Sequence, residues 1–269
     1  MNEQKSTIAI LDSGVGGLSI FQAIRQALPN LSIVYGCDNK NFPYGPKTPA
    51  LVTHCINELV SKIRINFDVK LIVIACNTAS TIALESLRQN SSIPIVGVVP
   101  AIKPAVEKSR TKTIGLLATP GTILRSYTDK LIEEFAPKCE VIKVGSTRLV
   151  ELAEEKSRGK IVSISQIQKE LAPFFPLKED SPIDTIVLGC THFPLLFNEL
   201  CEAVPKPIQW IDSSEAIAIR VKALIPSSQA LSSSIKPTFQ AVFTESNTDS
   251  NSLTPLLKRL GFSSISQFK

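Results

Sequence analysis

Short apolar runs alternate with stretches of helical period along most of the chain. The run TIAILD at residues 7–12 is typical of a buried strand, and residues 18–28 carry the apolar spacing of a following helix. The same order recurs where LIVIAC at residues 71–76 precedes a helical stretch at 81–89. Further strands are expected at residues 31–38, 93–99, 113–119, 139–145 and 185–190, and a further helix at 49–63. Because a helical crossover returns the chain to the end of the sheet where the previous strand began, consecutive strands run parallel. We therefore expect an α/β fold with largely parallel sheets flanked by helices.

Two stretches of the chain share one design. TIVLGCTHFP at residues 185–194 repeats the plan of LIVIACNTAS at 71–80: an apolar strand, a cysteine, a threonine within two residues, then a helix. This echo indicates two related α/β units, each with a cysteine at the carboxyl end of a strand. In parallel sheets ligands collect outside that end, so Cys76 and Cys190 are candidate site residues.

The position of these two thiols suggests their chemistry. A thiol between a strand and a helix meets the helix's unpaired N–H groups and positive dipole end, which favour the thiolate. One such cysteine alone is more often a small buried hydrophobe. Two in matching contexts indicate an acid/base pair, in which one takes a proton from one face of a carbon and the other delivers a proton to the opposite face. His192 follows Cys190 by two residues and is placed to assist that thiol, whereas His54 is expected at the surface.

Two loops are expected beside these cysteines. In LDSGVGGLS, at residues 11–19, Ser19 stands where a dinucleotide-binding motif has its third glycine, and there is no P-loop lysine. Asp12 and Ser13 end a strand there, and they can hold an ammonium and a carboxylate group. NFPYGPKT, at residues 41–48, is a turn-rich segment that can form a wall of the same cleft.

Composition excludes several other classes of function. The net charge of +5 is scattered, and the basic clusters KSRTK and KSRGK contain no aromatic residue, so no nucleic-acid partner is expected. The six cysteines show no C-x-x-C spacing and only two histidines are present, so neither disulfides nor a metal site are expected. No apolar window has the length of a membrane span, and the polar start MNEQKST does not resemble a secretory signal. We expect a cytoplasmic protein without a membrane partner.

At this point the motifs resemble those of glutamate racemases, in the aspartate/glutamate racemase superfamily. They are DSGVGG, PYG, ACNTAS, LLATPGT, GCTHFP and IDSSEA, in this order between residues 12 and 216. The resemblance implies two α/β domains of similar topology with the active site at their interface: a discontinuous first domain of residues 1–97 plus 211–269, and a second domain of residues 98–210. It also implies interconversion of L- and D-glutamate without a cofactor or a metal, supplying D-glutamate for peptidoglycan synthesis, cell wall biogenesis and cell shape.

The resemblance also implies roles for individual residues. Cys76 and Cys190 are the two acid/base thiols, assisted by Asp12 and His192. The implied substrate-binding residues are Asp12, Ser13, Tyr44, Gly45, Asn77, Thr78, Thr191 and His192, with Thr119 and Thr122 as weaker candidates. Glutamate is the implied small-molecule partner, and a homodimer is a candidate assembly. Phe193 and Ser214 depart from the usual motifs, and residues 144–155 follow the family only loosely, which leaves a role for Glu151 open. Activation by a cell-wall precursor is not expected.

Three alternatives remain open at the level of sequence. The first is an aspartate racemase or a related two-cysteine isomerase of the same superfamily. The second is a cysteine hydrolase built on Cys190 and His192, which leaves Cys76 unexplained. The third is a solute-binding module with a two-domain cleft and no catalysis.

Overall fold

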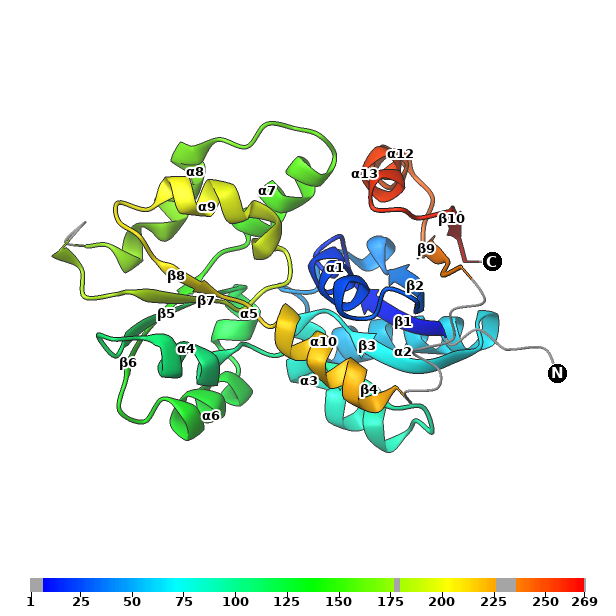
Figure 1. Ribbon diagram of the computed structural model, residues 1–269, viewed down its shortest axis with the longest axis horizontal. Helices are drawn as coiled ribbons and strands as arrows, with labels where there is room; N and C mark the ends of the chain where they lie inside the picture. Colours follow the sequence, from blue (N-terminus) through cyan, green and yellow to red (C-terminus); the bar gives the residue numbers. More distant parts are fainter. Residues whose placement is uncertain (1–6, 177–179, 226–235, 269) are drawn as a thin grey trace. The chain divides into compact units, whose positions relative to one another are not determined.

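The computed structural model describes residues 7–176, 180–225 and 236–268 (Figure 1). The chain divides into two compact units, Met1–Val98 with Ser214–Lys269 as unit 1 and Val99–Ser213 as unit 2. The crossings therefore follow residues 98 and 213, against 97 and 210 in the domain division that the resemblance implies. Each unit holds one sheet whose paired strands all run parallel.

Unit 1 contains a six-stranded sheet in the order β10-β9-β2-β1-β3-β4. Its strands are β1 (Thr7–Asp12), β2 (Ser32–Cys37), β3 (Val69–Ile74), β4 (Ile95–Gly97), β9 (Phe239–Phe243) and β10 (Ser264–Gln267). The inner strands are almost wholly buried, because helices cover both faces of a parallel sheet. This is why they appear in the sequence as unbroken apolar runs.

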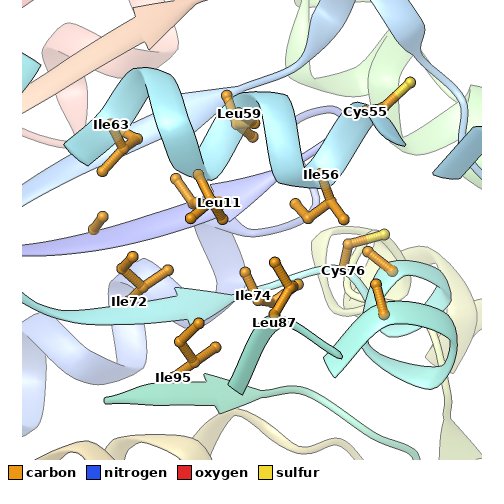
Figure 2. Packing of buried hydrophobic residues seen from close by; sticks show 14 of the residues in the cluster. Leu11, Cys55, Ile56, Leu59, Ile63, Ile72, Ile74, Cys76, Leu87 and Ile95 are labelled. Carbon is orange, nitrogen blue, oxygen red and sulfur yellow. The ribbon is translucent and has the colours of Figure 1, made fainter. Parts of the chain in front are cut away.

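The helices of unit 1 lie on both faces of this sheet. Helices α1 (Leu18–Ala27) and α10 (Ser214–Leu224) pack together, as do α2 (Pro49–Asn66) and α3 (Asn77–Gln89) (Figure 1). The other elements in the described part of this unit are a 3-10 turn η1 (Asn39–Asn41), α12 (Thr248–Ser252) and α13 (Thr254–Arg259). Figure 2 shows the apolar face of α2, with Ile56, Leu59 and Ile63, turned toward Leu11, Ile72 and Ile74 of the sheet.

Unit 2 contains a four-stranded sheet in the order β6-β5-β7-β8. Its strands are β5 (Thr113–Ala118), β6 (Glu140–Gly145), β7 (Thr185–Leu188) and β8 (Gln209–Ile211). Helices α4 (Ile102–Lys108) and α6 (Ser126–Phe135) pack together on one face, and α7 (Arg148–Ser157), α8 (Ile164–Leu171) and α9 (Phe197–Ala203) lie on the other (Figure 1). The short elements are α5 (Pro120–Ile123) and the 3-10 turns η2 (Ala172–Phe174) and η4 (Phe193–Leu196).

The α/β fold with parallel sheets and flanking helices is confirmed, with local differences. The strand expected at 185–190 ends at Leu188, and the helix expected directly after Cys190 is the 3-10 turn η4 followed by α9. The sequence PSSQALSSS at residues 226–234, which is expected to be a polar connection, lies outside the described residues. None of the helices in the described part of the chain has the length and apolarity of a membrane span.

Candidate active site

Neighbouring strands of unit 1 bring Asp12 and Cys76 to the same edge of the sheet. Strand β1 lies between β2 and β3, and Leu11 of β1 pairs with Ile74 of β3. One step further, the Ala75 N–H donates to the Leu11 carbonyl at 2.7 Å. Asp12 ends β1 and is fully buried, and Cys76 is the second residue after the end of β3. The two side chains therefore share the carboxyl edge of adjacent strands.

The loop after β1 folds closely over Asp12. A Cβ at Gly17 would lie 3.0 Å from the Ala75 Cβ and 3.1 Å from Asp12 Oδ2, so this close approach favours glycine. The Ser13 backbone N–H donates to Asp12 Oδ1 at 2.6 Å, which fixes the carboxylate from the backbone side. Ser13 itself is buried. A buried carboxylate in this place can receive a substrate ammonium group.

Cys76 occupies the N-cap position of α3. Its backbone is extended and the residue is 7% exposed. Cys76 therefore lies at the end of the helix where the first N–H groups have no partner within the helix. Asn77 and Thr78 begin the helix and are buried. The Asn77 Nδ2 amide is buried and finds no hydrogen-bond partner among the described residues. Leaving a buried donor unpaired costs about 1–3 kcal/mol, and a ligand oxygen can recover that cost.

The segment that carries Tyr44 and Gly45 is anchored through Asp38. The Tyr44 hydroxyl donates to Asp38 Oδ2 at 2.6 Å, and Asp38 also accepts from Thr244 Oγ1 at 2.8 Å. Burial, followed by the charge of Asp38 and smaller effects of Cys76 and Cys55, raises the pKa of Tyr44 far above its usual range. Tyr44 is thus a neutral hydrogen-bond donor within electrostatic reach of Cys76, and Gly45 beside it is partly exposed.

In unit 2 the same plan places Cys190 after β7. The Gly189 N–H donates to the Leu117 carbonyl at 2.7 Å, and a Cβ at Gly189 would lie 3.1 Å from the Ala118 Cβ. Cys190 therefore lies beside the end of β5, where Thr119 begins α5. The hydroxyls of Thr119 and Thr122 lie 3.0 Å apart, and the Thr119 side chain accepts a hydrogen bond from the Thr122 N–H as the N-cap of α5. Thr119 therefore stabilises the start of its own helix.

Cys190 is the first member of a buried chain of ionisable groups. Its Sγ lies 3.9 Å from His192 Nδ1, and His192 Nε2 lies 2.9 Å from Glu154 Oε1. All three side chains are buried, and Thr191 between them is buried as well. Burial lowers the pKa of His192, but the hydrogen bonds to Cys190 and Glu154 outweigh it and raise that pKa well above its usual range. The His192 ring is therefore held directly beside the Cys190 sulfur.

Glu154 is the functional candidate that the sequence reasoning did not find. The open question there concerned Glu151, which lies on the same helix but faces solvent and pairs with Arg148 at 2.8 Å. Glu154 belongs instead to the buried stripe of α7, with Leu149, Val150, Leu152 and Ala153. The signal available in the sequence was an acidic residue inside an apolar helix face.

The structure thus gathers the expected residues into two sets. Unit 1 holds Asp12, Ser13, Tyr44, Gly45, Asn77, Thr78 and Cys76, and unit 2 holds Cys190, Thr191 and His192. Both sets lie around the carboxyl ends of parallel strands. No group of three or more histidine, cysteine or acidic side chains in the described ranges is arranged to hold a metal ion.

Comparison with known proteins identifies the family. The family model described as Asp/Glu/Hydantoin racemase matches residues 13–221. A glutamate racemase from Yersinia enterocolitica is 46% identical over 261 residues, which is 97% of this chain and 90% of the relative. The chain belongs to the glutamate racemase family. This membership makes it an enzyme of the isomerase class.

Solved structures of glutamate racemases share the fold. The Escherichia coli glutamate racemase, in complex with L-glutamate and the activator UDP-MurNAc-ala, has a TM-score of 0.91 and 40% identity and covers 98% of both chains. The Francisella tularensis glutamate racemase, in complex with D-glutamate, has a TM-score of 0.82 and 26% identity, again with 98% of both chains covered.

Proposed function

We propose that this protein interconverts L- and D-glutamate by passing the α-proton between the substrate and two thiols, Cys76 and Cys190, without a cofactor. The observation that carries the proposal is the matched placement of the two cysteines. Each follows the carboxyl end of a buried parallel strand. Asp12 ends the strand next to the one that leads to Cys76, and His192 lies against Cys190. The family relatives solved with L-glutamate and with D-glutamate support the choice of substrate.

In this mechanism the two thiols act on opposite faces of the α-carbon. One thiolate removes the proton while the other thiol donates one, and the reverse reaction exchanges these roles. The mechanism requires both sulfur atoms to reach the same substrate atom. Cys76 lies at the N-terminus of α3, where the helix dipole favours negative charge, and Cys190 faces the His192 imidazole.

The α-proton of an amino acid is weakly acidic, so the developing carbanion needs fixed donors. Asp12 keeps the substrate ammonium protonated, which withdraws charge from the α-carbon. The Asn77 amide, with Nδ2 lacking a partner, donates to a substrate carboxylate, together with hydroxyls of Ser13, Thr78 and Thr191. Preorganised donors of this kind are worth several kcal/mol each in a site that excludes water.

The biological role follows from the product. We infer that the enzyme supplies D-glutamate for peptidoglycan synthesis, and so for cell wall biogenesis and cell shape. We infer a cytoplasmic location, because both catalytic groups must remain thiols and a reducing compartment keeps them so.

The test is exchange of the α-proton in deuterium oxide. Cys76→Ser and Cys190→Ser are each expected to lose racemisation of glutamate by chiral chromatography. Each should retain α-deuterium incorporation, followed by proton NMR, from only one enantiomer. Cys201→Ser, which changes an exposed thiol on α9, is the matched control and should behave as wild type. Full turnover by either catalytic variant contradicts the two-thiol mechanism. Faster turnover of aspartate than of glutamate contradicts the assignment of glutamate as the substrate.

A further inference from the structure

We propose that Arg158 is a positioning residue for the Cys190 half of this chemistry. Its guanidinium holds the Glu154 carboxylate in the orientation that keeps His192 against the Cys190 thiol. The inference rests on the proposed function of Cys190, and it adds a residue that touches neither the thiol nor the imidazole in any contact described above.

The contacts form a continuous chain with a different partner for each carboxylate oxygen. Arg158 Nη1 lies 2.7 Å from Glu154 Oε2, and Glu154 Oε1 lies 2.9 Å from His192 Nε2. The opposite ring nitrogen, Nδ1, faces Cys190 Sγ at 3.9 Å. Because the two oxygens of a carboxylate share one plane, fixing one of them to Arg158 also fixes the direction in which the other meets the imidazole.

The Arg158–Glu154 ion pair is more deeply buried than the Arg148–Glu151 ion pair of α7. The side chains of Arg158 and Glu154 are 21% and 5% exposed, whereas Arg148 and Glu151 are 35% and 52% exposed. Exposed pairs contribute little, since water competes for both partners. A carboxylate as buried as Glu154 depends on its partners, because without them it must turn toward water or take up a proton.

The other charged groups around this chain have partners of their own. Lys156 of α7 binds Glu199 of α9 at 2.7 Å and the Leu195 carbonyl of η4 at 2.9 Å. On the α8 side of the helix, Arg148 binds Glu155 at 3.0 Å, Glu151 at 2.8 Å and the Gln166 side chain at 3.0 Å. These contacts attach α7 to its neighbours, while the cation at Glu154 Oε2 comes from Arg158.

A positioning role of Arg158 and a simple charge effect predict opposite changes in the pKa of His192 when Arg158 is removed. If Arg158 acted only as a nearby positive charge, its removal would favour the imidazolium and raise the pKa of His192. If Arg158 orients Glu154, its removal releases the carboxylate, the imidazolium loses its partner, and the pKa of His192 falls. The direction of the change therefore decides between the two.

The experiment is a pH titration of the imidazole nitrogens by NMR. The chain has two histidines, so a His54→Gln background leaves the signals of His192 alone. In Arg158→Gln the midpoint of the His192 titration is expected to fall by about one pH unit, a tenfold change in the protonation equilibrium. Arg158→Lys should lie between this variant and wild type, because lysine keeps the charge but not the planar guanidinium. Arg148→Gln is the matched control on the same helix and should leave the titration unchanged.

An unchanged or higher midpoint in Arg158→Gln overturns the proposal. If that variant does not fold, Arg158→Lys decides, since a positioning role still requires its midpoint to fall. Racemisation at neutral pH is expected to drop about tenfold in Arg158→Gln and to be partly restored in Arg158→Lys. Because the titration reads His192 without any turnover, it fails or succeeds independently of the two-thiol mechanism.

Discussion

Asp184 gives a prediction whose size can be worked out from the structure. This carboxylate precedes β7 and ties the turn before β5 to the strand that leads to Cys190. It accepts hydrogen bonds from Ser109 Oγ at 2.7 Å, the Arg110 N–H at 2.7 Å, the Thr111 N–H at 3.1 Å and Thr185 Oγ1 at 2.9 Å. Burial raises its pKa, but these bonds outweigh burial and lower the pKa from 3.8 to about 2. The charged form is therefore stabilised by folding.

The contribution of Asp184 to the free energy of unfolding, and its dependence on pH, follow from the difference between its pKa in the folded and in the unfolded state. Since the folded-state pKa lies below the unfolded value, the contribution is fully present above the unfolded pKa of 3.8 and is lost as pH falls through about 2. The fall of the pKa from 3.8 to about 2 corresponds to roughly 2.4 kcal/mol, at about 1.36 kcal/mol for each pH unit. Because Asp184 is partly exposed, solvent screening reduces this to about 1–2 kcal/mol.

Urea unfolding of Asp184→Asn tests the reasoning. Trp210 is the single tryptophan and lies in β8, paired with Ile186 of β7, so its fluorescence reports on unit 2. At neutral pH the variant should be less stable than wild type by about 1–2 kcal/mol, and about half of this pH-dependent difference should be gone near pH ~3. A stability difference that stays constant over this pH range would refute the argument, because it would not come from the ionised carboxylate.

Three further substitutions have expected outcomes. Tyr44→Phe removes a buried donor to Asp38 and should lower the free energy of unfolding by about 1–3 kcal/mol in urea titrations; an unchanged value contradicts the role of that bond. Glu154→Gln should destabilise the protein most at mildly acidic pH and less as pH rises through the raised pKa of His192, since the imidazolium that pairs with Glu154 is then lost. A pH-independent effect in thermal unfolding would argue against that ion pair. Gly189→Ala should cost about 1–3 kcal/mol through overpacking and lower kcat, which steady-state racemisation assays would show.

The sequence was most informative where strands are buried on both faces. The expected strands at 7–12 and 113–119 correspond to β1 and β5 almost residue for residue, because helices on both sides demand continuous apolar runs. The edge strand β10, SISQ, is mostly exposed and carries no such run, so only its pairing with β9 reveals it. A strand that is exposed and is held only by pairing with its neighbour cannot be predicted from the apolar pattern of its own residues.

The site shows the same division between local and distant determinants. The placement of Asp12, Cys76 and Cys190 at the ends of strands was predictable because each lies where an apolar run stops. Glu154 was not, because it lies 38 residues from His192 in the chain. Its selection in place of Glu151 depends on which residues of α7 are buried. At 3.6 residues per turn the two side chains point only about 60° apart around the helix axis, and of the two only Glu154 falls within the buried stripe.

The discontinuity of unit 1 affects the order in which the protein is made. Strand β9 pairs with β2, yet its residues 239–243 are synthesised after all of unit 2. A nascent chain that has reached residue 213 contains every strand of the smaller sheet, while the outer edge of β2 still exposes backbone groups awaiting β9. Such an open edge can pair with other chains. The N-terminal segment of unit 1 therefore leaves the ribosome with a sheet that is completed only after β9 and β10 have been synthesised.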